Sequence, residues 1–283
     1  MPSSPLNPDS EIIINFCPTG MIPTREMNPH VPISPQEIIE QTHEAYELGI
    51  TVAHLHARLP DQSPTHEPEI YAEMMQGLHR HCPDLILCLS TSGRNVPEFE
   101  KRSAVIELYP DMCSLTLSSL NFAQGASLNS PDMIQRLLAK MLGYGVTPEL
   151  ECFDLGMINY GKYLIQKYEL PSDRIYWNLL FGNIFGAQTQ LSQMGAMLDQ
   201  IPPAHWLSVG GLGDYQLQAH AIAIASGRGV RVGLEDNLWL DRQRSRPASN
   251  LALLQRVHQL LEIHEKTCLS PRKLNLYNPR RKR

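Results

Sequence analysis

The sequence predicts an α/β fold, a single (β/α)8 TIM barrel, on two observations. First, short apolar runs alternate with longer amphipathic stretches at fairly even spacing along the chain of 283 residues. Continuous apolar runs of this kind are typical of parallel strands that helices cover on both faces. Second, eight strands with helices between them fill about the length of one such barrel. A doubly wound open sheet is the alternative, because the number of strands does not show whether a sheet closes.

The expected strands cover residues 12–16, 51–56, 85–90, 112–117, 149–153, 176–181, 206–210 and 229–234. We expect one barrel domain over residues 1–283, with a short N-terminal extension and a basic C-terminal tail. That tail, Asn278 to Arg283, is expected to be solvated or to bridge subunits. A site for an anionic ligand is the other interpretation of the tail.

Capping residues mark the helices between these strands. Ser34, Pro35 and Glu37 form a capping box, with serine as the N-cap, proline at the first helical position and glutamate at the third. Gly49 stands where this helix is expected to end. Ser130-Pro131 opens a second helix in the same way. The last two helices are expected after Asp214-Tyr215 and Pro247-Ala248.

The composition is ordinary for a soluble globular protein, with 42% hydrophobic residues, 19% charged residues and a net charge of −5. A mildly acidic chain gives no reason to expect nucleic acid or an anionic membrane as a partner. No apolar run approaches the roughly 20 residues that span a bilayer, and the first residues do not read as a secretory signal. The six cysteines form no CxxC pair, which favours reduced thiols and a cytoplasmic location and disfavours a cysteine-bound zinc.

Two histidines interrupt the second expected strand. His54 and His56 project to the same face because side chains alternate along a strand, and Arg58 follows on that side as the strand ends. Two neutral imidazoles on one face can bind one zinc ion. Ordinary interior histidines, hydrogen-bonded to their neighbours, are the alternative interpretation of the pair.

The last expected strand ends in charged residues, which are costly to bury unless they are paired or bound to a metal. The carboxyl ends of barrel strands converge on one pocket, so Glu235 can complete a His-His-Glu site that leaves a position open for substrate. Arg231 is four residues before Glu235, so it projects to the same face of the strand and lies deeper in the barrel. Asp236 has the opposite parity and reaches the pocket only if the strand has ended. A turn with solvated acids is the alternative.

Other strand ends are also polar. Ser90 to Arg94 offer hydroxyl and backbone N–H groups that suit a carboxylate, and Ser114 begins an alternating polar series in the next strand. Glu149 and Glu151 share one face of the fifth strand, where an ion pair with Arg231 or Arg58 is as reasonable as a catalytic role.

Six segments, in order along residues 11 to 265, resemble one known family, the β-keto acid cleavage enzymes. The segments are Pro18-Thr19-Gly20, Pro32 to Glu37, His54 to Arg58, Ser90 to Gly93, Ser119 to Phe122 and Gly233 to Asn237. The resemblance implies a zinc-bearing barrel that converts a β-keto acid and acetyl-CoA into acetoacetate and a new acyl-CoA.

The resemblance also implies roles for individual residues. The zinc ligands match His54, His56 and Glu235. The general base matches Asp236, supported by Arg231 and Ser90. Substrate contacts fall at Ser90, Gly93 and Ser114. We further expect a homo-oligomer, a dimer or tetramer, and we consider Arg94 as a contact for the phosphates of CoA.

One departure from the family pattern bears on the substrate. The 3-keto-5-aminohexanoate cleavage enzyme has a glutamate that can meet the substrate amine at the position where this chain has Ile22. Isoleucine cannot neutralise an ammonium group, so we expect a keto acid with an apolar or uncharged tail. Two other functions remain open, a zinc-dependent aldolase or hydrolase that uses no CoA and a non-catalytic homologue that binds a keto acid.

Overall fold

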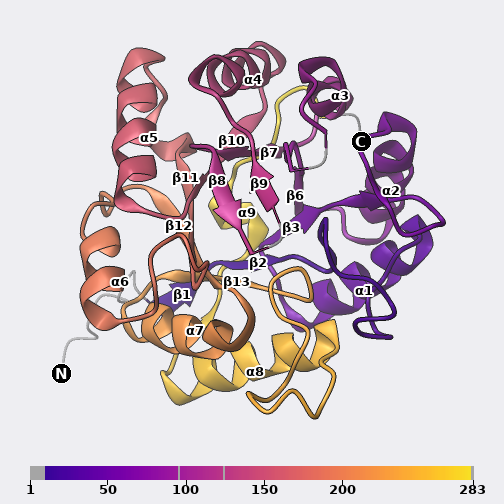
Figure 1. Cartoon of the computed structure of the whole chain (residues 1–283), viewed down its shortest axis with the longest axis vertical. Coiled ribbons are helices and arrows are strands. Elements are labelled where there is room, and N and C mark those ends of the chain that lie inside the picture. The colour runs from indigo at the N-terminus through magenta and orange to yellow at the C-terminus, as the bar shows by residue number, and fades with distance from the viewer. Residues whose placement is uncertain (1–9, 95, 124, 282–283) are drawn as a thin grey trace.

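The computed structural model describes residues 10–94, 96–123 and 125–281. Within these residues, eight parallel strands close into a barrel in the order β10-β11-β12-β13-β2-β3-β6-β7 (Figure 1). The strands are β2 Ile14–Phe16, β3 Val52–Leu55, β6 Ile86–Leu89, β7 Met112–Thr116, β10 Thr147–Cys152, β11 Tyr176–Phe181, β12 Trp206–Gly211 and β13 Gly229–Val232. The closure confirms the predicted (β/α)8 barrel and excludes the open sheet.

Helices surround the barrel and alternate with its strands along the chain (Figure 1). They are α1 Pro35–Leu48, α2 Pro68–His81, α3 Phe99–Ala104, α4 Pro131–Tyr144, α5 Leu155–Lys167, α6 Leu191–Leu198, α7 Gln216–Ala225 and α8 Asn250–Ile263, followed by the short α9 Pro271–Leu274. The capping box is confirmed, because the Ser34 hydroxyl accepts the Glu37 N–H and the Glu37 carboxylate accepts the Ser34 N–H. Gly49 ends α1 with φ +105°, a backbone conformation that favours glycine.

Three short ribbons lie outside the barrel. Glu11–Ile12 (β1) pairs with Thr267–Cys268 (β14), Ala57–Arg58 (β4) with Pro64–Thr65 (β5), and Leu120–Phe122 (β8) with Gly125–Ser127 (β9). The expected first strand, residues 12–16, is therefore divided between β1 and β2. The expected second strand, residues 51–56, ends at Leu55, and Arg58 belongs to a separate hairpin.

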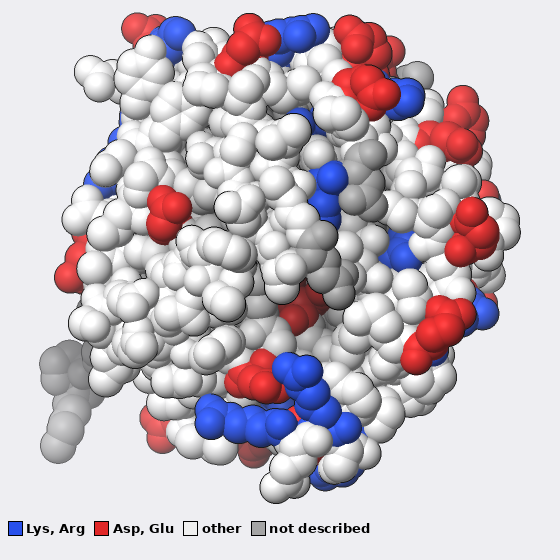
Figure 2. Space-filling view, in the orientation of Figure 1, with Lys and Arg blue, Asp and Glu red and all other residues white. Residues whose placement is uncertain are grey.

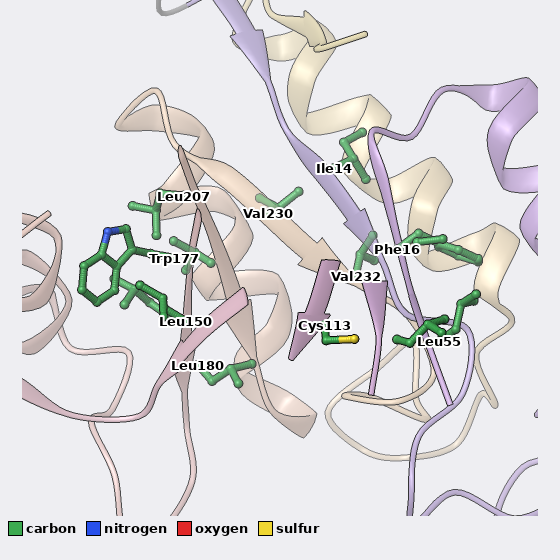
Figure 3. Close-up of a cluster of buried hydrophobic side chains, with 14 of the residues drawn as sticks. Ile14, Phe16, Leu55, Cys113, Leu150, Trp177, Leu180, Leu207, Val230 and Val232 are labelled. Atoms are coloured by element: carbon green, nitrogen blue, oxygen red, sulfur yellow. The ribbon is translucent and has the colours of Figure 1, made fainter. Parts of the chain in front are cut away.

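The two faces of the barrel strands differ in character. The outward face packs against the helices in a large apolar cluster, part of which is shown in Figure 3, with the labelled residues Ile14, Phe16, Leu55, Leu150, Trp177, Val230 and Val232. The inward face is mostly apolar at the amino ends of the strands, where a second cluster contains Val52, Ile86, Met112, Tyr176, Leu274 and Leu276. Towards the carboxyl ends, the inward positions carry polar and charged side chains, so the interior is filled at one end and chemically functional at the other.

The basic tail is solvated over only part of its described length, with Pro279 and Arg280 exposed. The Arg281 side chain is only 8% exposed, and its guanidinium lies 3.2 Å from the buried carboxylate of Asp111. Asn278 also contacts that carboxylate through its backbone N–H, at 3.0 Å. The tail therefore folds back on its own barrel, because Asp111 supplies a buried charge that needs a partner. Residues 282–283 lie outside the described part.

Two expectations about the chain as a whole can be compared with this structure. In the described part, none of the helices combines the length and apolar character needed to cross a membrane. All six cysteines are free thiols, five of them buried.

Candidate active site

A cavity of about 250 Å³ lies at the carboxyl ends of the barrel strands. Figure 2 shows a hollow near the middle of this face, with acidic atoms visible at its floor. The polar side chains that line the cavity are His54, His56, Ser90, Ser92, Arg94, Ser114, Thr116, Ser127, Glu151, Arg231, Glu235 and Asp236. Most of the residues singled out in the sequence therefore converge here, from strands that are far apart along the chain.

Three of these side chains turn their ligand atoms toward one point. The Nε2 atoms of His54 and His56 are 3.2 Å apart. A Glu235 oxygen, Oε1, lies 3.2 Å from the His56 Nε2, and Oε2 lies 3.9 Å from the His54 Nε2. One ligand atom from each residue can be chosen so that all three lie within 4.8 Å of one another.

These separations fit a zinc ion. Ligand atoms at the usual Zn–N and Zn–O distances on a tetrahedron are about 3.3 Å apart. The Oε2 atom of Glu235 is buried and has no hydrogen-bond partner among the described residues. A buried carboxylate oxygen without a donor is costly, and a cation bound between the three side chains would relieve that cost. The set leaves room for a fourth ligand, which is typical of catalytic zinc.

Glu149 holds the first histidine in place. Its carboxylate lies 2.7 Å from the His54 Nδ1 and also accepts hydrogen bonds from the side chains of Asn15, Cys88 and Asn178. Burial alone would raise the pKa of the Glu149 carboxyl, but the contact with His54 lowers that pKa below its ordinary value. An ionised Glu149 accepts a hydrogen bond from the Nδ1–H of His54, which leaves the Nε2 lone pair of His54 facing His56 and Glu235. The alternation of side chains in the sequence predicted the face on which Glu149 lies, but it did not predict the contact with His54.

A second possible cluster, His54, Cys88 and Glu149, has a different explanation. The Cys88 thiol donates to the Glu149 carboxylate at 3.2 Å. Burial raises the pKa of this thiol well above its ordinary value, so it stays protonated. These three groups form a hydrogen-bonded network that supports the histidine pair.

Arg231 connects the carboxylates of the site. The guanidinium is buried and lies 2.6 Å from Glu235, 2.9 Å from Asp236 and 3.6 Å from Glu151. The expected ion pair between Arg231 and the fifth strand is therefore present, through Glu151. A guanidinium with five donors can orient several carboxylates at once.

Asp236 reaches the cavity because β13 ends at Val232. The chain then turns, with the N–H groups of Asp236 and Asn237 bonded to the carbonyl of Gly233. Burial raises the pKa of Asp236, with a further contribution from Glu235, and this outweighs the opposing effect of Arg231. Pairing with arginine alone would have lowered the basicity of this carboxylate. In the structure, burial preserves it.

Two of the three expected substrate contacts, Ser90 and Ser114, lie on the opposite side of the cavity, and the Ser114 hydroxyl accepts the N–H of Thr91 at 3.0 Å. Gly93 does not belong to the described residues that line the cavity. It is packed against Arg102, where an added Cβ would lie 2.4 Å from the guanidinium. Arg102 was not singled out in the sequence. It bonds to the Thr91 carbonyl at 2.9 Å and so fixes the loop that follows β6.

Arg58 does not join this site, contrary to the prediction. Its guanidinium donates to the backbone carbonyls of Gly20, Pro23 and Gln62, and it lines a separate surface pocket. The alternation of faces stops where β3 ends at Leu55, so parity no longer relates Arg58 to His54. Arg58 instead ties together the loops that follow the first two barrel strands.

The chain is similar to known proteins over most of its length. Residues 11–275 match the family described as beta-keto acid cleavage enzyme. The 3-oxoadipate:acetyl-CoA acetyltransferase of Cupriavidus necator is 34% identical over 254 residues, which are 88% of each chain. The 3-keto-5-aminohexanoate cleavage enzyme of Fusobacterium nucleatum is 32% identical, over 88% of this chain and 91% of that protein.

A solved structure resembles the barrel as well. The apo structure of ObcA superposes with a TM-score of 0.75 at 20% identity, over 87% of this chain and 64% of that chain, and shows the shared fold. The match over residues 11–275 and the two relatives above 30% identity give the same assignment. The chain is an enzyme that belongs to the β-keto acid cleavage enzyme family.

Proposed function

We propose that this enzyme condenses a β-keto acid with acetyl-CoA to give acetoacetate and a new acyl-CoA, with zinc at His54, His56 and Glu235. The main support is that a three-residue ligand set lies beside a buried carboxylate, Asp236, and a buried guanidinium, Arg231, in one cavity. The names of the two relatives support the reaction, since one is an acetyl-CoA acetyltransferase and both act on keto acids.

When bound, zinc would act as a Lewis acid that polarises the keto oxygen and acidifies the adjacent carbon. Asp236 is the general base that removes a proton from this carbon, and Arg231 orients it at 2.9 Å. The hydroxyls of Ser90 and Ser114 bind the carboxylate of the keto acid from the other side of the cavity. Ser90 thereby also supports Asp236 by holding the carbon acid toward it.

The overall reaction balances without a further reagent. The carbon that loses its proton forms a bond to the acetyl carbonyl carbon, and CoA leaves as the thiolate. The thiolate then attacks the original keto carbon, the bond between this keto carbon and the newly acetylated carbon breaks, and acetoacetate departs as the new acyl-CoA forms. Asp236 receives the proton in the first half of the reaction and can return it to acetoacetate in the second.

A direct assay tests the reaction. Purified enzyme is mixed with acetyl-CoA and one of several β-keto acids, and acetoacetate and acyl-CoA are measured by mass spectrometry. We expect both products in equal amounts, and neither when acetyl-CoA is omitted. Cleavage without acetyl-CoA would indicate the aldolase or hydrolase alternative, and binding without turnover would indicate the non-catalytic one.

Elemental analysis tests the metal. The His54→Ala variant is expected to lose its zinc, whereas His43→Ala, which removes an exposed histidine on α1, keeps it. Full zinc retention in His54→Ala would contradict the ligand assignment.

A further inference from the structure

Arg94 stands at the junction of two hollows. It lines the cavity that contains His54, His56 and Glu235, and it also lines a larger outer pocket of about 590 Å³. Ile22 and Phe122 line both as well. A substrate whose reacting end lies at the histidine pair can therefore extend its other end past these side chains into the outer pocket.

The charge of Arg94 has no partner in the described residues. The guanidinium lies 3.5 Å above the centre of the Phe122 ring, and the described ion pairs do not include it. The carboxylates of Glu235 and Glu151 act on it electrostatically but lie beyond ion-pair distance. Stacking on an aromatic ring holds a guanidinium in a fixed plane and leaves its N–H donors free for a planar anion.

We propose that the β-keto acid used by this enzyme carries a second anionic group at the end of its tail, most simply a carboxylate, and that Arg94 binds it. This inference rests on the proposed function, which places the reacting carboxylate at Ser90 and Ser114. Arg94 is therefore available for a group at the other end of the molecule. A guanidinium and a carboxylate can form two parallel hydrogen bonds, which fixes the direction of the tail.

Ile22 and Arg94 together determine whether the substrate tail can be positively or negatively charged. Isoleucine at position 22 gives no counter-charge to an ammonium group, and Arg94 repels one. Ile22 alone suggested an apolar or uncharged tail, but the unpaired cation beside it favours an anion. The carbon chain between the two ends would pack on Ile22 and on the Phe122 ring.

The phosphates of CoA fit this position less well. Arg94 lines the same cavity as the metal-ligand set, whereas the diphosphate is separated from the thioester carbon by the whole pantetheine arm. An anion on the keto acid reaches Arg94 across a few carbon atoms. The two possibilities differ in which substrate loses affinity when the charge is removed.

Two substrates of the same shape test the proposal. One is the keto diacid 3-oxoadipate, and the other is 6-methyl-3-oxoheptanoate, in which an isopropyl group replaces the distal carboxylate. Wild-type enzyme is expected to prefer the diacid in kcat/KM by about 10- to 100-fold, the value of one charge-assisted pair. Arg94→Gln should lose that preference, because kcat/KM falls much more for the diacid than for the isopropyl compound. Arg94→Lys should restore part of it.

Arg136 provides a matched control because its guanidinium also lies over a phenylalanine ring, that of Phe99 at 4.0 Å, but outside the cavity. Arg136→Gln is expected to behave as wild type. An equal loss for both keto acids in Arg94→Gln, or a raised KM for acetyl-CoA alone, would overturn the proposal. If wild type turned over neither compound, the proposed function would fail. Calorimetric titration of 3-oxoadipate in the absence of acetyl-CoA would still test whether Arg94 binds the distal carboxylate. Tighter binding to wild type than to Arg94→Gln supports the assignment, and equal binding refutes it.

Discussion

The Nδ1 atom of His54 lies 2.7 Å from the carboxylate of Glu149, a residue 95 positions later in the chain. The contact crosses the barrel interior, since β3 and β10 are separated by β6 and β7 in the sheet. Both side chains are buried. The orientation of the first histidine therefore depends on a residue that is not part of the proposed ligand set.

Glu149→Gln tests this dependence. The amide is a weaker acceptor than the carboxylate, and one of its two ends must point an N–H₂ group at donors that now bond to Glu149. We expect zinc affinity to fall by about 10- to 100-fold, as for other carboxylates that orient a metal-binding histidine. Competition with a coloured chelator measures the affinity. The control is Glu107→Gln, which removes an exposed carboxylate paired with Lys140. Unchanged affinity in Glu149→Gln would show that the contact does not orient the ligand.

Asp236→Asn separates the base from the metal. Asparagine preserves the shape of the side chain but cannot accept a proton, so turnover should fall by about 10²- to 10⁴-fold. Zinc content should stay near that of wild type, because Asp236 is not part of the ligand set. The two readouts are a steady-state assay and elemental analysis of the same preparation. A near-normal rate would exclude Asp236 as the base, and loss of zinc would mean that it acts through the metal site.

Gly20→Ala tests how closely the first loop packs against the ligand set. A Cβ at position 20 would lie 2.4 Å from the Cγ of Glu235, so the glutamate must move away from the two histidines. We expect a loss of zinc affinity of at least about 10-fold while the chain remains folded, since a side chain can rotate away more easily than the backbone.

Gly195→Ala, in α6, is the matched substitution, because a Cβ there meets nothing within 4 Å. It should leave zinc affinity unchanged. Equal zinc affinity in Gly20→Ala and wild type would mean that Glu235 is free to adjust without leaving its position. Circular dichroism of both variants checks that the fold is retained.

Arg281→Ala tests the role of the basic tail. Removing the guanidinium leaves the Asp111 carboxylate buried with fewer donors, and we expect a loss of about 1–3 kcal/mol in the free energy of unfolding. Arg280→Ala is the control, since the guanidinium of this exposed neighbour donates to a backbone carbonyl, that of Gly143, at 3.0 Å and not to a buried carboxylate. Urea denaturation measures both. If Arg281→Ala were as stable as the control, the tail would not contribute to the barrel.

The sequence predicted those parts of the molecule in which local pattern and spatial position coincide. Apolar runs such as 176–181 specify strands, and the parity of His54 and His56 specifies a shared face. The same alternation gave the wrong position for Arg58, because β3 ends at Leu55 and Arg58 belongs to β4. The contact between Glu149 and His54 depends on which strands lie across the barrel from each other, which no local pattern shows. The burial of Arg281 could not be predicted because it depends on a distant aspartate, Asp111.

Glu149 also has a consequence for the order of assembly. Its carboxylate contacts Asn15 in β2, His54 in β3, Cys88 in β6 and Asn178 in β11. These contacts require that strands from the first and later parts of the chain have already docked, and closing such long loops is slow. In a zinc finger, the ion organises an otherwise unfolded chain. Here we expect the barrel to form before the proposed ion binds, and not around the ion.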